Sequence, residues 1–181
     1  MRTRGRKRLV IDTDVVQSSG SEKATDPRAV SCREFLKAVR SYNYRVVVTK
    51  EINAEWKRHR SGFAHEWKVS MYARRRIEDI NPSENDTLLD KITTATNDPD
   101  EVEMMQKDFH LLQAALETDK IVISLDQTVR NLFANASQQV GEIRIIIWVN
   151  PERTLEEQPI PWLKNGAPVE THRRLSAYLT Q

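Results

Sequence analysis

The sequence predicts an α/β protein with three layers, in which helices cover both faces of a central, mainly parallel sheet of roughly four to five strands. Two observations predict this class. Short β-branched runs alternate along the chain with apolar stripes at helical spacing, and an aspartate-proline pair precedes two of those stripes. Strands that alternate with helices are joined by crossover connections, which make the strands parallel.

The first predicted strand is the apolar run over residues 9–11, which ends in Asp12 and Asp14. A polar loop over residues 17–25 follows it. Asp26-Pro27 then starts the first helix, because aspartate is a favoured N-cap and proline fits the first helical position. The apolar stripe of this helix stops near residues 42–43, where we expect the helix to end.

Residues 46–48 are a β-branched run and form the second predicted strand. Thr49 can cap the helix that comes next, and Ser61-Gly62 is a plausible break in it. Beyond the break, aromatic and apolar residues recur at helical spacing, so a second long helix is expected to run from residue 63 towards residue 80. Residues 81–98 are polar and acidic, and their pattern assigns no element.

Asp98-Pro99 repeats the cap-and-proline signal and starts a helix with a regular apolar stripe. After a short turn, residues 121–123 form a β-branched strand that leads to Asp126. The apolar spacing beyond Asp126 predicts a further helix that ends at Gly141. Residues 145–149 supply the last predicted strand.

A length of 181 residues fits one domain with an appendage. We expect a domain over residues 1–150 that begins with a basic arm, and a proline-rich C-terminal extension over residues 151–181 that ends in a short helix. Cys32 is the only cysteine, which excludes an internal disulfide and a cysteine-built metal site and fits a reducing cytoplasm. The longest apolar run, residues 145–149, is too short to cross a membrane.

Charged residues are segregated along the chain, although the formal net charge is only +2. Lysine and arginine dominate the N-terminal arm and residues 57–76, whereas aspartate and glutamate dominate residues 78–103. A basic stretch of this kind can bind phosphates, but the simpler interpretation is a solvated helix face that pairs with the acidic stretch.

Three carboxylates, Asp12, Asp14 and Asp126, follow predicted strands. The carboxyl ends of parallel strands share one edge of a sheet, where α/β proteins bind ligands. Asp108 is expected to lie level with Asp126, because the helix and the strand that flank the turn at residues 117–120 each extend roughly 15 Å from this turn. Mg²⁺ and Mn²⁺ prefer oxygen ligands, so these converging acids favour a site for either ion.

The chain resembles the PIN-domain nucleases, the family that includes the ribonuclease toxins of the VapC type. The resemblance rests on LVIDTD at the first strand, TKEINAEW after the second, and DFHLLQAALETDKIVISLD further on. Carried over by position in these motifs, the family's acids fall on Asp12, Glu55, Asp108 and Asp126. The chain departs from the family in three places: Asp14 stands where the family often has asparagine, the segment over residues 57–98 is longer, and the tail is extra.

The resemblance implies a metal-dependent endoribonuclease that hydrolyses phosphodiester bonds of single-stranded RNA. Asp12, Asp108 and Asp126 would bind Mg²⁺ or Mn²⁺, Asp14 would add a ligand or merely form hydrogen bonds, and Glu55 would act as a ligand or activate water. The expected partners are RNA, a second copy in a homodimer, and an antitoxin-like protein. The basic side chains expected to bind RNA are Lys57, Arg58, Arg60, Arg74, Arg75 and Arg76.

Several of these residues have a second interpretation. Glu51 competes with Glu55, because it is nearer the helix start and so nearer the strand ends. Asp126 can simply cap the helix that follows it. Trp56 and Trp67 can stack bases, but each falls on an apolar stripe and is better explained as a core residue.

Two different functions also stay open. In a phosphatase of the haloacid-dehalogenase type, Asp12 and Asp14 would be the nucleophile and the acid, and Thr49 would end the second strand as that family requires. A helix-borne Asp108 has no role in such an enzyme. In a catalytically inactive PIN-like module that binds RNA or protein, the acids would be vestigial.

Overall fold

Parallel strands form the centre of the protein. The computed structural model describes residues 7–58 and 61–178. Within these residues, a five-stranded sheet has the order β3-β2-β1-β4-β5, and every neighbouring pair is parallel. The strands are β1 (Arg8–Ile11), β2 (Arg45–Val48), β3 (Ile77–Asp79), β4 (Ile121–Ile123) and β5 (Ile147–Val149). The predicted three-layer α/β/α class is confirmed.

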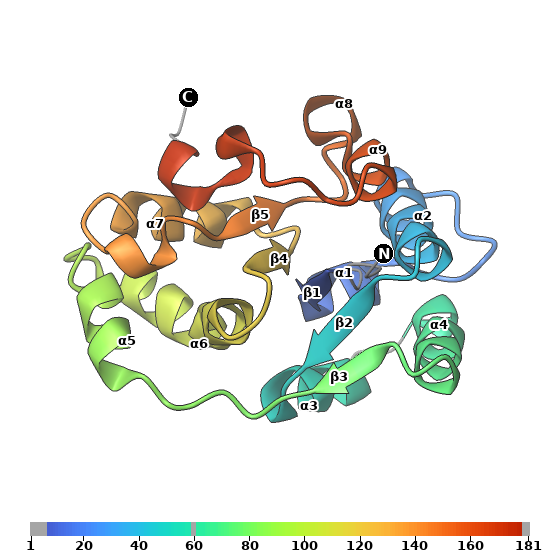
Figure 1. Ribbon diagram of the computed structural model, residues 1–181, viewed down its shortest axis with the longest axis horizontal. Helices are drawn as coiled ribbons and strands as arrows, with labels where there is room; N and C mark the ends of the chain where they lie inside the picture. Colours follow the sequence, from blue (N-terminus) through green and yellow to red (C-terminus); the bar gives the residue numbers. More distant parts are fainter. Residues whose placement is uncertain (1–6, 59–60, 179–181) are drawn as a thin grey trace, which may run out of the picture.

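Helices lie on both sides of this sheet. They are α1 (Thr13–Ser18), α2 (Pro27–Ser41), α3 (Lys50–Arg58), α4 (Gly62–Ala73), α5 (Asp86–Thr93), α6 (Pro99–Leu116), α7 (Gln127–Ala136), α8 (Thr154–Glu157) and α9 (Pro159–Lys164). Figure 1 shows α5, α6 and α7 on one side of the sheet and α2, α4 and α9 on the other. Because neighbouring strands are parallel, each connection returns the chain to the amino-terminal edge of the sheet before the next strand begins.

The predicted helix starts are confirmed by their capping hydrogen bonds. Asp26 accepts from the N–H of Ala29 at 3.1 Å, and Thr49 Oγ1 accepts from the N–H of Ile52 at 3.2 Å. The helix that begins after Asp98 is capped by that residue in the same way. Trp56 and Trp67 are 2% and 0% exposed, as expected of core residues.

The expected long helix over residues 63–80 is wrong. Helix α4 ends at Ala73, and Arg75 adopts a left-handed backbone with φ of 54°, which stops the helix. Residues 77–79 then form the edge strand β3 beside β2. The unassigned acidic stretch contains α5, whose cap Asn85 accepts from the N–H of Leu88 at 3.0 Å.

Two further boundaries also differ from the prediction. The polar loop expected over residues 17–25 begins later, because α1 starts at Thr13 and runs to Ser18. The helix after Asp126 ends at Ala136 rather than at Gly141, and Gly141 begins the short 3-10 helix η1 (Gly141–Ile143). Val140 misled the prediction, because it is buried but lies outside the helix.

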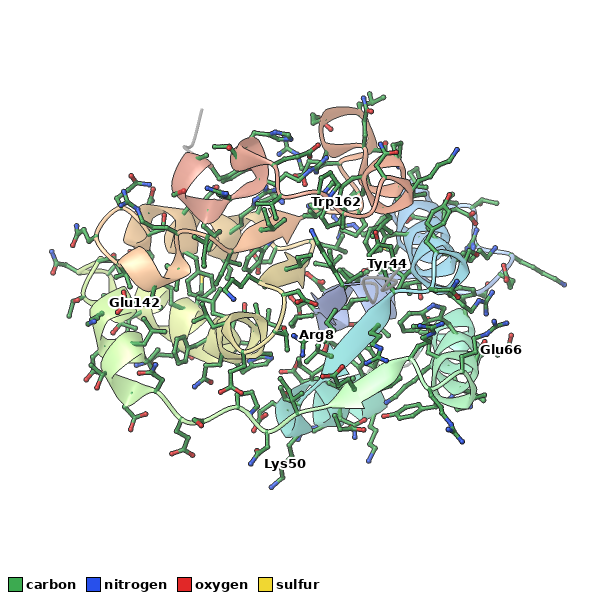
Figure 2. The ribbon with its side chains drawn as sticks, in the orientation of Figure 1. Arg8, Tyr44, Lys50, Glu66, Glu142 and Trp162 are labelled. Atoms are coloured by element: carbon green, nitrogen blue, oxygen red, sulfur yellow. The ribbon has the colours of Figure 1, made fainter. Side chains whose placement is uncertain are left out.

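The C-terminal extension packs against the domain. Tyr44 Oη donates to the Leu163 carbonyl at 2.7 Å, and the N–H of Leu175 donates to the Ile146 carbonyl at 2.9 Å. Figure 2 shows Trp162 of α9 on the side of the extension that faces α2, and Tyr44, which directly precedes β2, close to it. The extension ends in 3-10 turns, η2 (Thr171–Arg173) and η3 (Leu175–Ala177), where a short helix was expected.

Within the described ranges, no helix combines the length and the apolar character that a membrane span needs. Polar side chains gather at the edge of the sheet formed by the carboxyl ends of β1 and β4.

Candidate active site

Asp12 stands at the junction of β1 and α1. Its N–H donates to the Ile123 carbonyl at 2.9 Å, which extends the pairing of β1 with β4 to the last residue before the helix. Its side chain makes no capping bond to α1. Asp12 Oδ2 instead accepts from the hydroxyl of Ser124 at 2.8 Å. Because Ser124 directly follows β4, the end of the neighbouring strand fixes the position of the Asp12 carboxylate.

Asp14 lies in the first turn of α1 and points back to the same loop after β4. Its Oδ2 accepts from the N–H of Leu125 at 2.9 Å and lies 3.1 Å from the hydroxyl oxygen of Ser124. Its Oδ1 is buried and has no hydrogen-bond partner among the described residues. A buried carboxylate oxygen without a partner costs free energy, which a proton or a cation would offset.

Three acids in this region, Asp12, Asp14 and Asp108, have a raised pKa and so hold their protons more tightly than ordinary carboxylates. Burial, and after it the negative charge of Asp12, raises the pKa of Asp14 to about 8. Burial also raises the pKa of Asp12 itself. For Asp108, burial and then the charge of Asp12 raise the pKa to about 6. Carboxylates that are buried together resist ionisation unless a cation balances them.

Glu55 reaches the site from α3. Its Oε2 accepts from the Thr13 hydroxyl at 2.9 Å and lies 3.7 Å from Nε2 of His110, an α6 residue whose side chain is 14% exposed. Glu51, the alternative, is exposed and does not line the cavity described below. The geometry therefore brings Glu55, and not Glu51, to the other acids.

Asp108 and Asp126 complete the set. Asp108 is half-buried on α6, beside the buried Leu111 and Leu112 of the same helix. Asp126 caps α7, because its Oδ1 accepts from the N–H of Val129 at 2.9 Å. The capping interpretation of Asp126 is therefore confirmed, and Asp126 nevertheless lines the same cavity as Asp108.

All of these acids meet at one cavity of about 330 Å³, which we call the acid cavity. It is lined by Asp12, Thr13, Asp14, Gln17, Glu55, Arg58, Lys107, Asp108 and Asp126. Among the described residues, no three histidine, cysteine, aspartate or glutamate side chains lie close enough to hold an ion jointly. Mg²⁺ usually keeps several of its waters, so the residues fit a hydrated ion that some acids contact directly and others through water.

The predicted RNA-binding residues do not gather at the acid cavity as one group. Arg58 lines it, and Lys57 lies next along α3. Arg60 lies outside the described residues. Residues 74–76 precede β3, at the opposite edge of the sheet from the cavity, where Arg76 donates to the Asn43 carbonyl at 3.3 Å.

Sequence reasoning missed four residues of the site: Ser124, Lys107, Thr13 and Gln17. Ser124 and Thr13 each stand next to a predicted acid, and a hydroxyl beside a strand-end carboxylate is the signal that identifies such a partner. Lys107 precedes Asp108 and has no comparable signal. It supplies, with Arg58, the positive charge that the cavity contains.

No protein-family model matches the chain, and no curated protein matches it. The chemistry of the site therefore rests on its own geometry. A cavity that combines carboxylates with an arginine and a lysine can hold a divalent cation together with a phosphate group.

Proposed function

We propose that the protein is a metal-dependent endoribonuclease that hydrolyses single-stranded RNA, with the architecture of a PIN-like nuclease. One observation carries the proposal: Asp12, Asp14, Glu55, Asp108 and Asp126 come from separate segments of the chain and line one cavity with Arg58 and Lys107. Packing alone has no use for such a set, because each buried carboxylate costs free energy. The choice of RNA rests on the family resemblance.

Mg²⁺ or Mn²⁺ fits the donor set, which offers carboxylate oxygens and an unpartnered Asp14 Oδ1. Asp12, Asp14, Asp108 and Asp126 would hold the ion directly or through its waters. When bound, the ion supplies an activated water and balances the negative charge that develops on the phosphate.

The remaining residues bind and orient. Arg58 and Lys107 contact the phosphate oxygens of the strand, because they are the cationic side chains in the cavity wall. Glu55 accepts the proton of the attacking water, and the Thr13 hydroxyl, at 2.9 Å from Oε2, orients this carboxylate. His110 Nε2 lies 3.7 Å from the same oxygen of Glu55.

The test is cleavage of an end-labelled single-stranded RNA in Mn²⁺. We expect the wild type to cleave it, and Asp12→Asn and Asp108→Asn to reduce the rate by at least about 100-fold, because each removes a charge that holds the ion. Asp79→Asn is the matched control. Asp79 also lies at the carboxyl end of a strand, but it is exposed and outside the cavity lining.

Three outcomes refute the proposal. Cleavage that survives both substitutions would exclude the acid cavity as the active site. Turnover of a small phosphomonoester with phosphate trapped on Asp12, without RNA cleavage, would identify a phosphatase. RNA binding without any metal-dependent turnover would identify a binding module.

A further inference from the structure

A second cavity lies beside the acid cavity, on the other side of α3. It has a volume of about 190 Å³, and its walls include Val16, Trp56, Lys57, Lys68, Val69 and Tyr72. We call it the aromatic pocket. Two elements contribute to both cavities: α3 places Glu55 and Arg58 in the acid cavity and the intervening Trp56 and Lys57 in the aromatic pocket, and α1 does the same with Gln17 and Val16.

The side chains of the aromatic pocket offer flat apolar faces to a ligand. Trp56 is 2% exposed and forms a buried wall, whereas Tyr72 and Val69 of α4 are 42% and 57% exposed at the rim. Aromatic rings next to a small apolar wall are what stacked nucleobases contact in proteins that bind single strands.

Positive charge surrounds these faces. Lys68 Nζ lies 5.2 Å from the centre of the Trp56 ring and 5.9 Å from the centre of the Tyr72 ring, while it donates to Asn53 Oδ1 at 2.9 Å. Lys57 lines the same pocket, and His65 lines it as well. A cationic rim around an aromatic floor is complementary to a nucleotide, which combines a flat base with a phosphate.

Trp56 adds an independent observation. Its Nε1 is buried and has no acceptor among the described residues. Buried donors are nearly always paired, so this unpaired N–H needs an explanation, and a ligand would reach it only by displacing the side chains that cover it. A base carries ring nitrogens and carbonyl oxygens, which are acceptors of the kind that this donor lacks.

We infer that the aromatic pocket receives one nucleobase of the RNA strand, next to the nucleotide whose phosphate occupies the acid cavity. This inference rests on the proposed function, because it takes single-stranded RNA as the substrate. The pocket would fix the position of the strand on α3 and so determine which phosphodiester bond lies at the acids.

The experiment measures the Kd of an end-labelled single-stranded RNA by fluorescence anisotropy in EDTA, so that no cleavage occurs. Tyr72→Ala should raise the Kd by about 5- to 150-fold, the usual effect of removing a stacking ring. Tyr72→Phe should bind like the wild type, because it retains the ring. Val69→Glu should weaken binding, whereas Val169→Glu should not. Val169 is a matched control, 60% exposed and outside the pocket.

A second measurement identifies the bound base. RNAs that lack one base at a time are compared on the wild type and on Tyr72→Ala. One abasic position should weaken binding to the wild type and have little further effect on Tyr72→Ala, because ring and base contribute to the same contact. Circular dichroism spectra that match the wild type confirm that each variant is folded.

The inference is overturned if Tyr72→Ala and Val69→Glu bind RNA like the wild type, or if the wild type binds no RNA. It is also overturned if each missing base weakens the binding of Tyr72→Ala as much as it weakens the binding of the wild type. Metal-dependent cleavage without any dependence on Tyr72 would overturn the pocket and leave the nuclease proposal standing. Binding that depends on Tyr72 and on one base, without cleavage in Mn²⁺, would support the pocket and refute the nuclease.

Discussion

Replacement of Glu157 by glutamine should destabilise the protein more than any ordinary surface substitution. Glu157 belongs to the C-terminal extension and is 8% exposed. Its carboxylate accepts from the Arg130 guanidinium, lies 3.9 Å from Arg173 Nη1, and accepts from the N–H of Asn150 at 3.0 Å. Both arginines are buried, at 2% and 5% exposed, so the carboxylate balances charge that water does not reach.

The magnitude follows from that burial. Glutamine keeps the shape of the side chain but removes the charge, and breaking a buried ion pair from one side costs about 3–5 kcal/mol. Burial already lowers the pKa of Arg130, and the Glu157 carboxylate opposes that shift, so the guanidinium depends on its partner. For a chain of 181 residues, the loss corresponds to a fall in Tm of roughly 6–20 °C.

The assay is urea unfolding followed by circular dichroism, with Glu156→Gln as the control. Glu156 is the adjacent residue and is exposed, so its substitution should change the free energy of unfolding by less than about 0.5 kcal/mol. Equal effects of the two substitutions would refute the reasoning, because the buried carboxylate would then contribute no more than a solvated one.

The same substitution should also lower nuclease activity. Asn150, which donates its N–H to Glu157, donates its side-chain amide to the Leu125 carbonyl at 3.2 Å. The N–H of Leu125 in turn holds Asp14. A chain of hydrogen bonds therefore connects the extension to the acid cavity, and activity should fall at temperatures where Glu157→Gln is still fully folded.

Two further predictions concern the acids themselves. Because the pKa of Asp14 is raised from 3.8 to about 8, the folded protein keeps a proton that the unfolded chain releases, so metal-free stability should fall as the pH rises through that interval. Asp14→Asn should flatten this dependence in urea unfolding with EDTA at pH 5 and pH 8, and an unchanged slope would contradict it. Asp126→Ala should cost about 1 kcal/mol of stability through the lost cap, whereas Asp126→Asn retains a cap. Both should lose metal-dependent cleavage, and retained cleavage in Asp126→Asn would restrict Asp126 to capping.

Elements with strong local signals were predictable from the sequence. The pairs Asp26-Pro27 and Asp98-Pro99 mark the starts of α2 and α6, because the cap and the proline act on the backbone within one turn. The buried strands β1, β2 and β4 are β-branched runs. Asp12, Asp14 and Asp126 were also predictable because they follow these strands, and Asp108 because the length of its helix places it level with Asp126. Glu55 was expected only from the family resemblance.

Features that depend on tertiary contacts were not predictable. Strand β3 consists of Ile77, Glu78 and Asp79, which form neither an apolar run nor a clear alternation, and pairing with β2 alone makes it a strand. The left-handed Arg75 that ends α4 has no glycine signal. The position of residues 74–76 away from the cavity follows from that strand, and the expected helix over residues 63–80 gave no indication of it.

The hydroxyl of Ser124 limits how much negative charge the site can hold without a cation. It lies 2.8 Å from Asp12 Oδ2 and 3.1 Å from Asp14 Oδ2, but a hydroxyl has one proton to donate. The N–H of Asp126 donates to the same oxygen at 3.1 Å. If both carboxylates were ionised, one of them would face the Ser124 hydroxyl oxygen with no proton between the two oxygens. In the metal-free protein, a proton on Asp14 therefore completes the hydrogen bonding around Ser124. If a cation binds as proposed, it would replace that proton, and its affinity would rise with pH through the range in which Asp14 titrates.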